Sequence, residues 1–267
     1  MAKGNDGNYL QHSIEVALAW HLVTRTAGNR LHIALAHGMA PYEACGSLPA
    51  GQTRALLVDA LQRGRQPKLD GEPPIVSAYR ATNASLERYP NTGELLAGII
   101  GRDRLTGGIT ETNHEKHAAL QETWLRSGVT SVARSWRNEI QPGGVLSCPA
   151  SLESPWLFSG DPMTYHDDGY ADDDQLYRSD GGSLSALLKC FIDSGQPGAA
   201  SLFVYAVKPE TRPKFWRFTD ELAEQAGAVN VSCWVTHQGG NRHLAAILCS
   251  PSMLRPTWLP QPLRFGR

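Results

Sequence analysis

The 267-residue sequence lacks the features of a membrane-spanning or disulfide-stabilised protein. Its longest apolar runs, such as residues 14–23 and 202–207, are far shorter than the roughly 20 residues that cross a bilayer. It has five cysteines, none in a CxxC pair, and its first residues do not resemble a signal peptide. We therefore expect a cytoplasmic protein with reduced thiols and no membrane partner.

An excess of charge of either sign is also missing. The 25 Lys and Arg residues balance 26 Asp and Glu residues, which gives a formal net charge of -1. The whole surface therefore does not favour a nucleic-acid polymer, although a local basic face can still exist. Nine histidines are present, but none has two further ligands at the spacing of a metal site, and we predict no metal.

Apolar periodicity alternates between the strand and the helix type along the chain. An amphipathic helix is predicted over residues 9–23. Further helices are predicted over 53–62, from 75 onward, and over 114–125, 183–194 and 215–226. Strands are predicted at 31–36, 108–111, 130–133, 155–160, 202–207, 229–236 and 243–249.

This alternation predicts an α/β fold with a doubly wound, mostly parallel sheet. The last two strands form a C-terminal antiparallel hairpin at one edge, and residues of about 45–90 form a helical insertion after the first strand. One domain is expected over residues 1–251. The proline-containing segment 252–267 has no periodicity and is expected to be an extended tail.

Three candidate sites follow predicted strands, where the ligand of such a sheet lies. After the first strand, His37 and Gly38 form a turn in which glycine lets the backbone approach a ligand. Glu111 follows the second strand, where a carboxylate can accept both hydroxyls of a ribose. Asp161, held by Pro162, can accept a hydrogen bond from an amine. Taken singly, the first two are equally compatible with an ordinary turn or a solvated charge, and a bare Asp-Pro is more often an ordinary turn.

Taken together, the landmarks resemble the large-subunit ribosomal RNA adenine-N6 methyltransferase family of the J type, in the same order along the chain. The matching segments are residues 4–12, 36–38, 89–93, 103–105, 161–162, 204–208 and 240–248. The resemblance implies a Rossmann-like class I methyltransferase fold. It also implies S-adenosyl-L-methionine (SAM) as cofactor and adenine in RNA or DNA as the acceptor of a methyl group.

The resemblance also implies roles for single residues. Asp161 and Pro162 match the start of the family's Asp-Pro-Pro-Tyr motif, and Tyr165, one residue late, is the predicted aromatic that flanks the base. The residues expected to bind SAM are Asn5, Gln11, His12, His37, Gly38, Glu111 and Trp136.

The sequence departs from the family both in the segments expected to bind SAM and in the motif expected to bind the adenine. Asn8 and Gln11 replace an Asp and a Lys, Trp136 stands near the family's Asp-Gly, and Thr164 replaces the motif's Tyr. Two alternatives therefore stay open. One is a SAM-dependent enzyme with a small-molecule acceptor, favoured by the acidic stretch 167–174, and the other is a non-catalytic methyltransferase-like binding protein.

A set of basic and aromatic residues is a candidate surface for single-stranded nucleic acid. Its members are Arg134, Arg137, Arg212, Lys214 and Arg217, with Trp136, Phe215 and Trp216. The alternative interpretation is scattered exposed cations beside partly buried aromatic rings.

Overall fold

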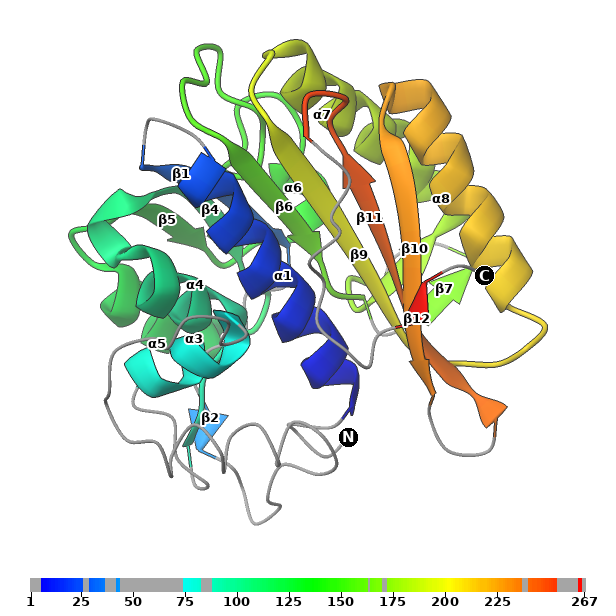
Figure 1. Cartoon of the computed structure of the whole chain (residues 1–267), viewed down its shortest axis with the longest axis horizontal. Coiled ribbons are helices and arrows are strands. Elements are labelled where there is room, and N and C mark those ends of the chain that lie inside the picture. Colours follow the sequence, from blue (N-terminus) through cyan, green and yellow to red (C-terminus); the bar gives the residue numbers. More distant parts are fainter. Residues whose placement is uncertain are drawn as a thin grey trace.

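The computed structural model describes residues 6–25, 29–36, 42–43, 74–82, 88–162, 164–169, 172–236, 240–253 and 264–265. Within these residues eight strands form one sheet, in the order β12-β10-β11-β9-β6-β1-β4-β5 (Figure 1). Their bounds are β1 Leu31–Ala36, β4 Leu105–Thr110, β5 Gly128–Val132, β6 Trp156–Gly160, β9 Gly198–Val207, β10 Val229–Thr236, β11 Arg242–Cys249 and β12 Arg264–Phe265.

The central strands of the sheet are parallel. β1 pairs in parallel with β4 and β6, β4 with β5, and β6 with β9. β11 lies between β9 and β10 and is antiparallel to both, and the short β12 is antiparallel to β10 at the outer edge. The predicted hairpin is therefore present, with its second strand inside the sheet.

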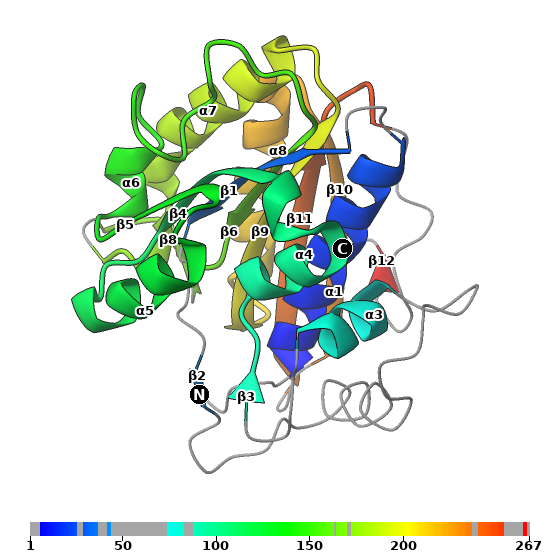
Figure 2. The ribbon, with the colours of Figure 1, turned by 90° about the vertical axis from the view of Figure 1, so that its left-hand side faces the viewer.

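Helices cover both faces of this sheet, because its strands carry apolar side chains on both sides. On one face lie α1 (Asp6–Arg25), α3 (Pro74–Ala81) and α4 (Thr92–Ile100), with α5 (His114–Trp124) packed against β5 (Figure 2). The other face is covered by α6 (Trp136–Glu139), α7 (Gly181–Asp193) and α8 (Arg212–Ala226). The predicted fold class, a doubly wound α/β sheet, is confirmed.

Short elements complete the described part of the chain. β2 (Tyr42–Glu43) pairs with β3 (Arg88–Tyr89) in antiparallel fashion, and β7 (Thr164–His166) pairs with β8 (Gln175–Tyr177) in parallel. Single 3-10 turns lie at η1 (Arg102–Arg104) and η2 (Arg178–Asp180).

Helices α3 and α4 form the described part of the insertion between β1 and β4. The predicted helix from residue 75 corresponds to α3, and the helix predicted over 53–62 lies outside the described residues. Helix α4 was not predicted, although its start has a recognisable capping box. The Asn91 side chain accepts a hydrogen bond from the Glu94 N–H at 2.8 Å, and Glu94 accepts one from the Asn91 N–H at 3.2 Å.

The boundaries of the insertion and of the tail stay predictions, because most of their residues lie outside the described ranges. Within the residues that the structure describes, no helix is long and apolar enough to cross a membrane.

Candidate active site

The carboxyl ends of the parallel strands meet at one edge of the sheet, and two of the predicted site residues lie there. Glu111 directly follows β4, and Asp161 directly follows β6. β1 separates these two strands in the sheet, so the two carboxylates flank the carboxyl end of β1. In a parallel α/β sheet this is the edge at which ligands bind.

Asp161 belongs to a buried hydrogen-bond network beneath α1. Alternation along β6 directs Phe158 toward α7 and Ser159 toward α1, and Asp161 follows the direction of Ser159. The Tyr205 hydroxyl on β9 is hydrogen-bonded to the Asp161 carboxyl and lies 2.9 Å from Gln11 Oε1. The structure thus brings together Gln11 and Asp161, two predicted site residues 150 positions apart in sequence.

The Tyr205 hydroxyl links these two residues. It has a single hydrogen and lies within hydrogen-bond distance of both the Asp161 carboxyl and the Gln11 side-chain oxygen, so it donates to one of them at a time. The contact between Tyr205 and Asp161 can form with either an ionised or a neutral Asp161.

Glu15 extends the network and was missed from the sequence. It is fully buried on α1, one turn after Gln11. Its carboxylate accepts hydrogen bonds from the Ser159 hydroxyl, from Thr92 Oγ1 at 2.8 Å and from Gln11 Nε2 at 3.4 Å. Burial raises the pKa of Glu15 to about 7, although these three donors oppose the shift. The available signal was a carboxylate within the apolar face of the predicted first helix.

Burial also raises the pKa of Asp161 well above its usual value. The hydrogen bond from Tyr205 opposes this shift, the charge of Glu15 reinforces it, and Asp174 adds a smaller contribution. Glu15 and Asp161, here called the carboxyl pair, therefore influence each other's protonation. At neutral pH a proton is readily held on the pair.

Glu111 lies in a less enclosed environment. Its N–H donates to the Val132 carbonyl at 3.1 Å, and its Oε1 accepts a hydrogen bond from the Asn113 N–H at 2.9 Å. Burial raises the pKa of Glu111, while the Asn113 N–H and Lys116 oppose the rise. Asp174, in the acidic stretch, also raises the pKa of Glu111. The charge of Asp174 therefore affects the carboxylates that follow both β4 and β6.

His12 is buried beside Gln11 on α1. Burial lowers the pKa of His12 to about 3, so its imidazole is neutral at physiological pH. A neutral ring can donate one hydrogen bond and accept another, but it adds no positive charge to the acidic site.

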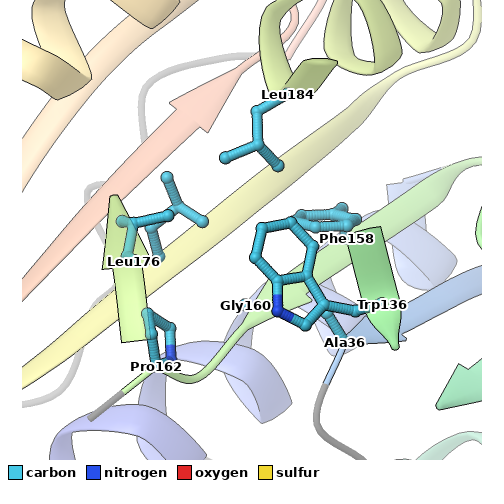
Figure 3. Close-up of a pocket in the computed structure, with 8 residues that line it drawn as sticks. Ala36, Trp136, Phe158, Gly160, Pro162, Leu176 and Leu184 are labelled. Carbon is cyan, nitrogen blue, oxygen red and sulfur yellow. The ribbon is translucent and has the colours of Figure 1, made fainter. Parts of the chain in front are cut away.

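Pro162 and Trp136 line a small apolar pocket on the opposite side of the sheet, facing α7 (Figure 3). Its walls are Ala36, Trp136, Phe158, Gly160, Pro162, Leu176, Leu184 and Leu202. The Trp136 ring is buried, and its indole N–H donates to the Asp173 carbonyl at 3.1 Å. Trp136 thus forms an aromatic wall near the ends of β1 and β6, and its contact with the SAM adenine stays a prediction.

The structure does not bring Tyr165 to the site. The ring is buried against α8, with its centroid 5.1 Å from that of Phe218 and 6.0 Å from that of Phe215. Its hydroxyl donates to Asp167 at 3.1 Å. The predicted base-flanking role is corrected here, because β7 directs Tyr165 toward α8, where its buried ring packs against Phe215 and Phe218.

The predicted basic and aromatic surface is only partly formed. Phe215, Trp216 and Trp136 are buried, so they offer no exposed rings. Arg137 is only slightly exposed, and it pairs with Asp180 at 2.7 Å and with Asp173 at 2.8 Å. The three cations of α8 remain at the surface or partly exposed.

Three predicted SAM-binding residues, Asn5, His37 and Gly38, lie outside the described residues. In the part of the chain that the structure describes, no three His, Cys, Asp or Glu side chains are grouped as a metal site would require.

With the strand order and this site in place, the fold is that of a Rossmann-like class I methyltransferase. No protein-family model matches the chain, and no curated protein matches it in sequence. Protein LPL1258 from Legionella pneumophila str. Philadelphia 1 has a similar structure, with a TM-score of 0.55 and 13% identity. The similarity covers 93% of this chain and 87% of that one, and it supports the fold.

Two weaker similarities support no conclusion at their TM-scores. A probable spermidine synthase from Corynebacterium glutamicum has a TM-score of 0.45 and 10% identity, covering 93% of this chain and 66% of that one. A precorrin-6y C5,15-methyltransferase from Geobacter metallireducens has a TM-score of 0.30 and 15% identity, covering 58% of this chain and 72% of that one. The J-type adenine-N6 methyltransferase family is not confirmed by these comparisons.

Proposed function

We propose that this protein is a SAM-dependent N-methyltransferase whose acceptor is an adenine in nucleic acid. The observation that carries the proposal is the partly buried Asp161 carboxyl, hydrogen-bonded to Tyr205 at the carboxyl end of a central strand. A carboxylate there can accept a hydrogen bond from an exocyclic amine and hold its nitrogen in line for methyl transfer.

The described residues fit SAM as the cofactor. Glu111 can accept hydrogen bonds from both ribose hydroxyls. The negative charge of Glu15, Glu111 and Asp174 suits a ligand that carries a sulfonium and an ammonium group. When bound, SAM supplies an electrophilic methyl group.

The chain's own contribution is alignment and control of one proton. Asp161 accepts a hydrogen bond from the acceptor amine most strongly when it is ionised, and a nearby cationic ligand favours that form. As the nitrogen–carbon bond forms, the sulfur–carbon bond breaks, and the amine proton leaves afterwards to Asp161 or to water. Because no strong base is required before the attack, proximity and alignment supply most of the rate.

Two variants test this proposal in sequence. Calorimetry with SAM and S-adenosylhomocysteine should show micromolar binding that Glu111→Ala abolishes and that the exposed Glu115→Ala on α5 retains. Asp161→Asn should then lower methyl transfer to adenine-containing RNA about 100- to 1000-fold, with a much smaller loss of SAM affinity. Asp193→Asn, an exposed substitution on α7, is the matched control. Full turnover by Asp161→Asn would remove the assigned role, and absence of SAM binding would favour the non-catalytic alternative.

A second candidate, transfer to a small cationic amine, is favoured by two observations. Tyr165 is packed into the core, so it is not placed to stack on a base. Asp174 also adds negative charge near Glu111 and Asp161, which disfavours a polyanion at the reaction centre. A methylated product formed from SAM and a polyamine, without any nucleic acid, would support this candidate.

A further inference from the structure

Five cations lie at the carboxyl end of β9, at the start of β11 and in the N-terminal half of α8. They are Lys208, Arg212, Lys214, Arg217 and Arg242, here called the basic surface. Because β11 is antiparallel to β9, Arg242 at its start pairs with Val207 at the end of β9. The first turn of α8 begins at the same edge, directly after β9.

Members of the basic surface lie close enough to repel each other. Burial and the neighbouring charge of Arg242 both lower the pKa of Arg212. Lys214 is paired with Asp167 at 2.7 Å, but Arg217 opposes the resulting rise of the Lys214 pKa. Arg217 and Arg242 form no ion pair with any described residue. Glu210 and Asp168 also lie near these cations, and five cations against Glu210, Asp167 and Asp168 leave the basic surface with an excess of positive charge.

The charge order along α8 opposes the helix dipole. Arg212, Lys214 and Arg217 lie in its N-terminal half, and Asp220, Glu221 and Glu224 lie in its C-terminal half. Cations are unfavourable near the positive end of a helix, and acids are unfavourable near the negative end. An anion bound beside Arg212 and Lys214 would relieve this repulsion, so the charge order is consistent with a ligand.

Arg242 also lies over the face of an aromatic ring. Its guanidinium carbon lies 3.6 Å from the centroid of the Trp234 ring on β10, and both side chains are partly exposed. Aromatic and guanidinium planes are the groups on which unstacked bases pack in single-stranded complexes. No comparable exposed stack is seen elsewhere in the described residues.

We propose that the basic surface binds the sugar–phosphate backbone of a single-stranded nucleic acid, with the Arg242–Trp234 stack as the platform for one base. This inference rests on the proposed nucleic-acid acceptor and names its docking surface. The strand would approach Asp161 from β9 and β11, while the donor lies over β1 and β4. The acidic stretch would then lie beside the donor and would repel only a backbone that crossed to that side.

The test is the salt dependence of binding to a labelled single-stranded adenine-containing RNA, measured by fluorescence anisotropy. Each lost phosphate contact should lower the slope of log affinity against log salt by about 0.7. The double variant Lys208→Gln, Arg217→Gln should therefore lower the slope by about 1.4, with at least a tenfold loss of affinity at low salt. Lys189→Gln, which removes one exposed cation on α7, should leave both quantities unchanged.

The remaining outcomes separate this inference from the proposed function. An unchanged slope in the double variant, with SAM binding and transfer intact, would overturn the docking surface alone. A lowered slope in a protein that does not bind SAM would retain the surface and overturn the methyltransferase. Equal affinity and slope for polyglutamate would overturn the nucleic-acid assignment, because such a surface would recognise charge without base stacking.

Discussion

The carboxyl pair and the basic surface differ in how the fold holds their charges. Glu15 and Asp161 are enclosed beneath α1, and neutral donors from Gln11, Ser159 and Tyr205 satisfy them. The basic surface faces solvent, and most of its cations have few or no fixed partners. The charge of a buried group depends mainly on its protonation, whereas the effect of an exposed charge depends mainly on screening by salt. The first region should therefore respond to pH, and the second to ionic strength.

The largest expected effect concerns the cation that anchors the acidic stretch. Arg137 is buried against Asp180 and Asp173, so Arg137→Ala leaves the Asp180 carboxylate buried without its ion-pair partner. We expect a loss of about 3–5 kcal/mol in the free energy of unfolding, measured by urea denaturation. Lys189→Ala, which breaks an exposed pair with Asp193, should cost less than about 0.5 kcal/mol. Similar losses in both variants would contradict the distinction between buried and exposed charge.

Glu15→Gln should change how stability depends on pH. Because the pKa of Glu15 is raised from 4.5 to about 7, the folded protein binds more protons than the unfolded chain between these values. Its contribution to stability is complete below pH 4.5 and is lost as pH rises through 7. Relative to Glu15→Gln, the wild type should lose about 3 kcal/mol between pH 4.5 and pH 7.5.

The matched control for Glu15→Gln is Glu122→Gln on the exposed face of α5, which should follow the wild-type curve. Parallel stability curves for the wild type and Glu15→Gln would show that the buried carboxyl does not titrate in this range. Glu15→Gln should also shift the pH profile of methyl transfer to lower pH, because the charge of Glu15 raises the pKa of Asp161.

The smallest expected effect concerns Tyr165, which is linked to the basic surface through Asp167. Tyr165 packs on α8, and its hydroxyl donates to Asp167, which pairs with Lys214. Tyr165→Phe keeps the ring and removes only this hydrogen bond, so we expect a loss of about 1 kcal/mol in stability and unchanged methyl transfer. A fall in kcat of tenfold or more would show that the hydroxyl acts in the reaction.

The sheet could be predicted from sequence where apolar runs are bounded by turns. β1 and β10 have their predicted limits, but β9 begins four residues earlier than predicted, at Gly198. The small residues at its start were not recognised as a strand. In the structure a Cβ at Gly198 would lie 2.2 Å from the Trp156 ring, so the missing side chain makes room for that ring.

From local sequence patterns, only the site residues that directly follow strands could be predicted. Asp161 and Glu111 follow strands, and the sequence identifies such positions. The contribution of Glu15 depends on α1 and α4 packing over β6, which no local pattern reveals. Tyr165 was misplaced because the two-residue alternation of β7, and not its distance from Asp161, decides where the ring points.

The surroundings of Asp161 also affect calorimetry. Burial raises the pKa of Asp161 well above its usual value, and a cationic ligand beside it favours the ionised form, so binding of such a ligand would release a proton from Asp161 into solution. The buffer would take it up with its own heat of ionisation. The apparent enthalpy of SAM binding would therefore differ between phosphate and Tris at the same pH. The size of this difference would give the number of protons released.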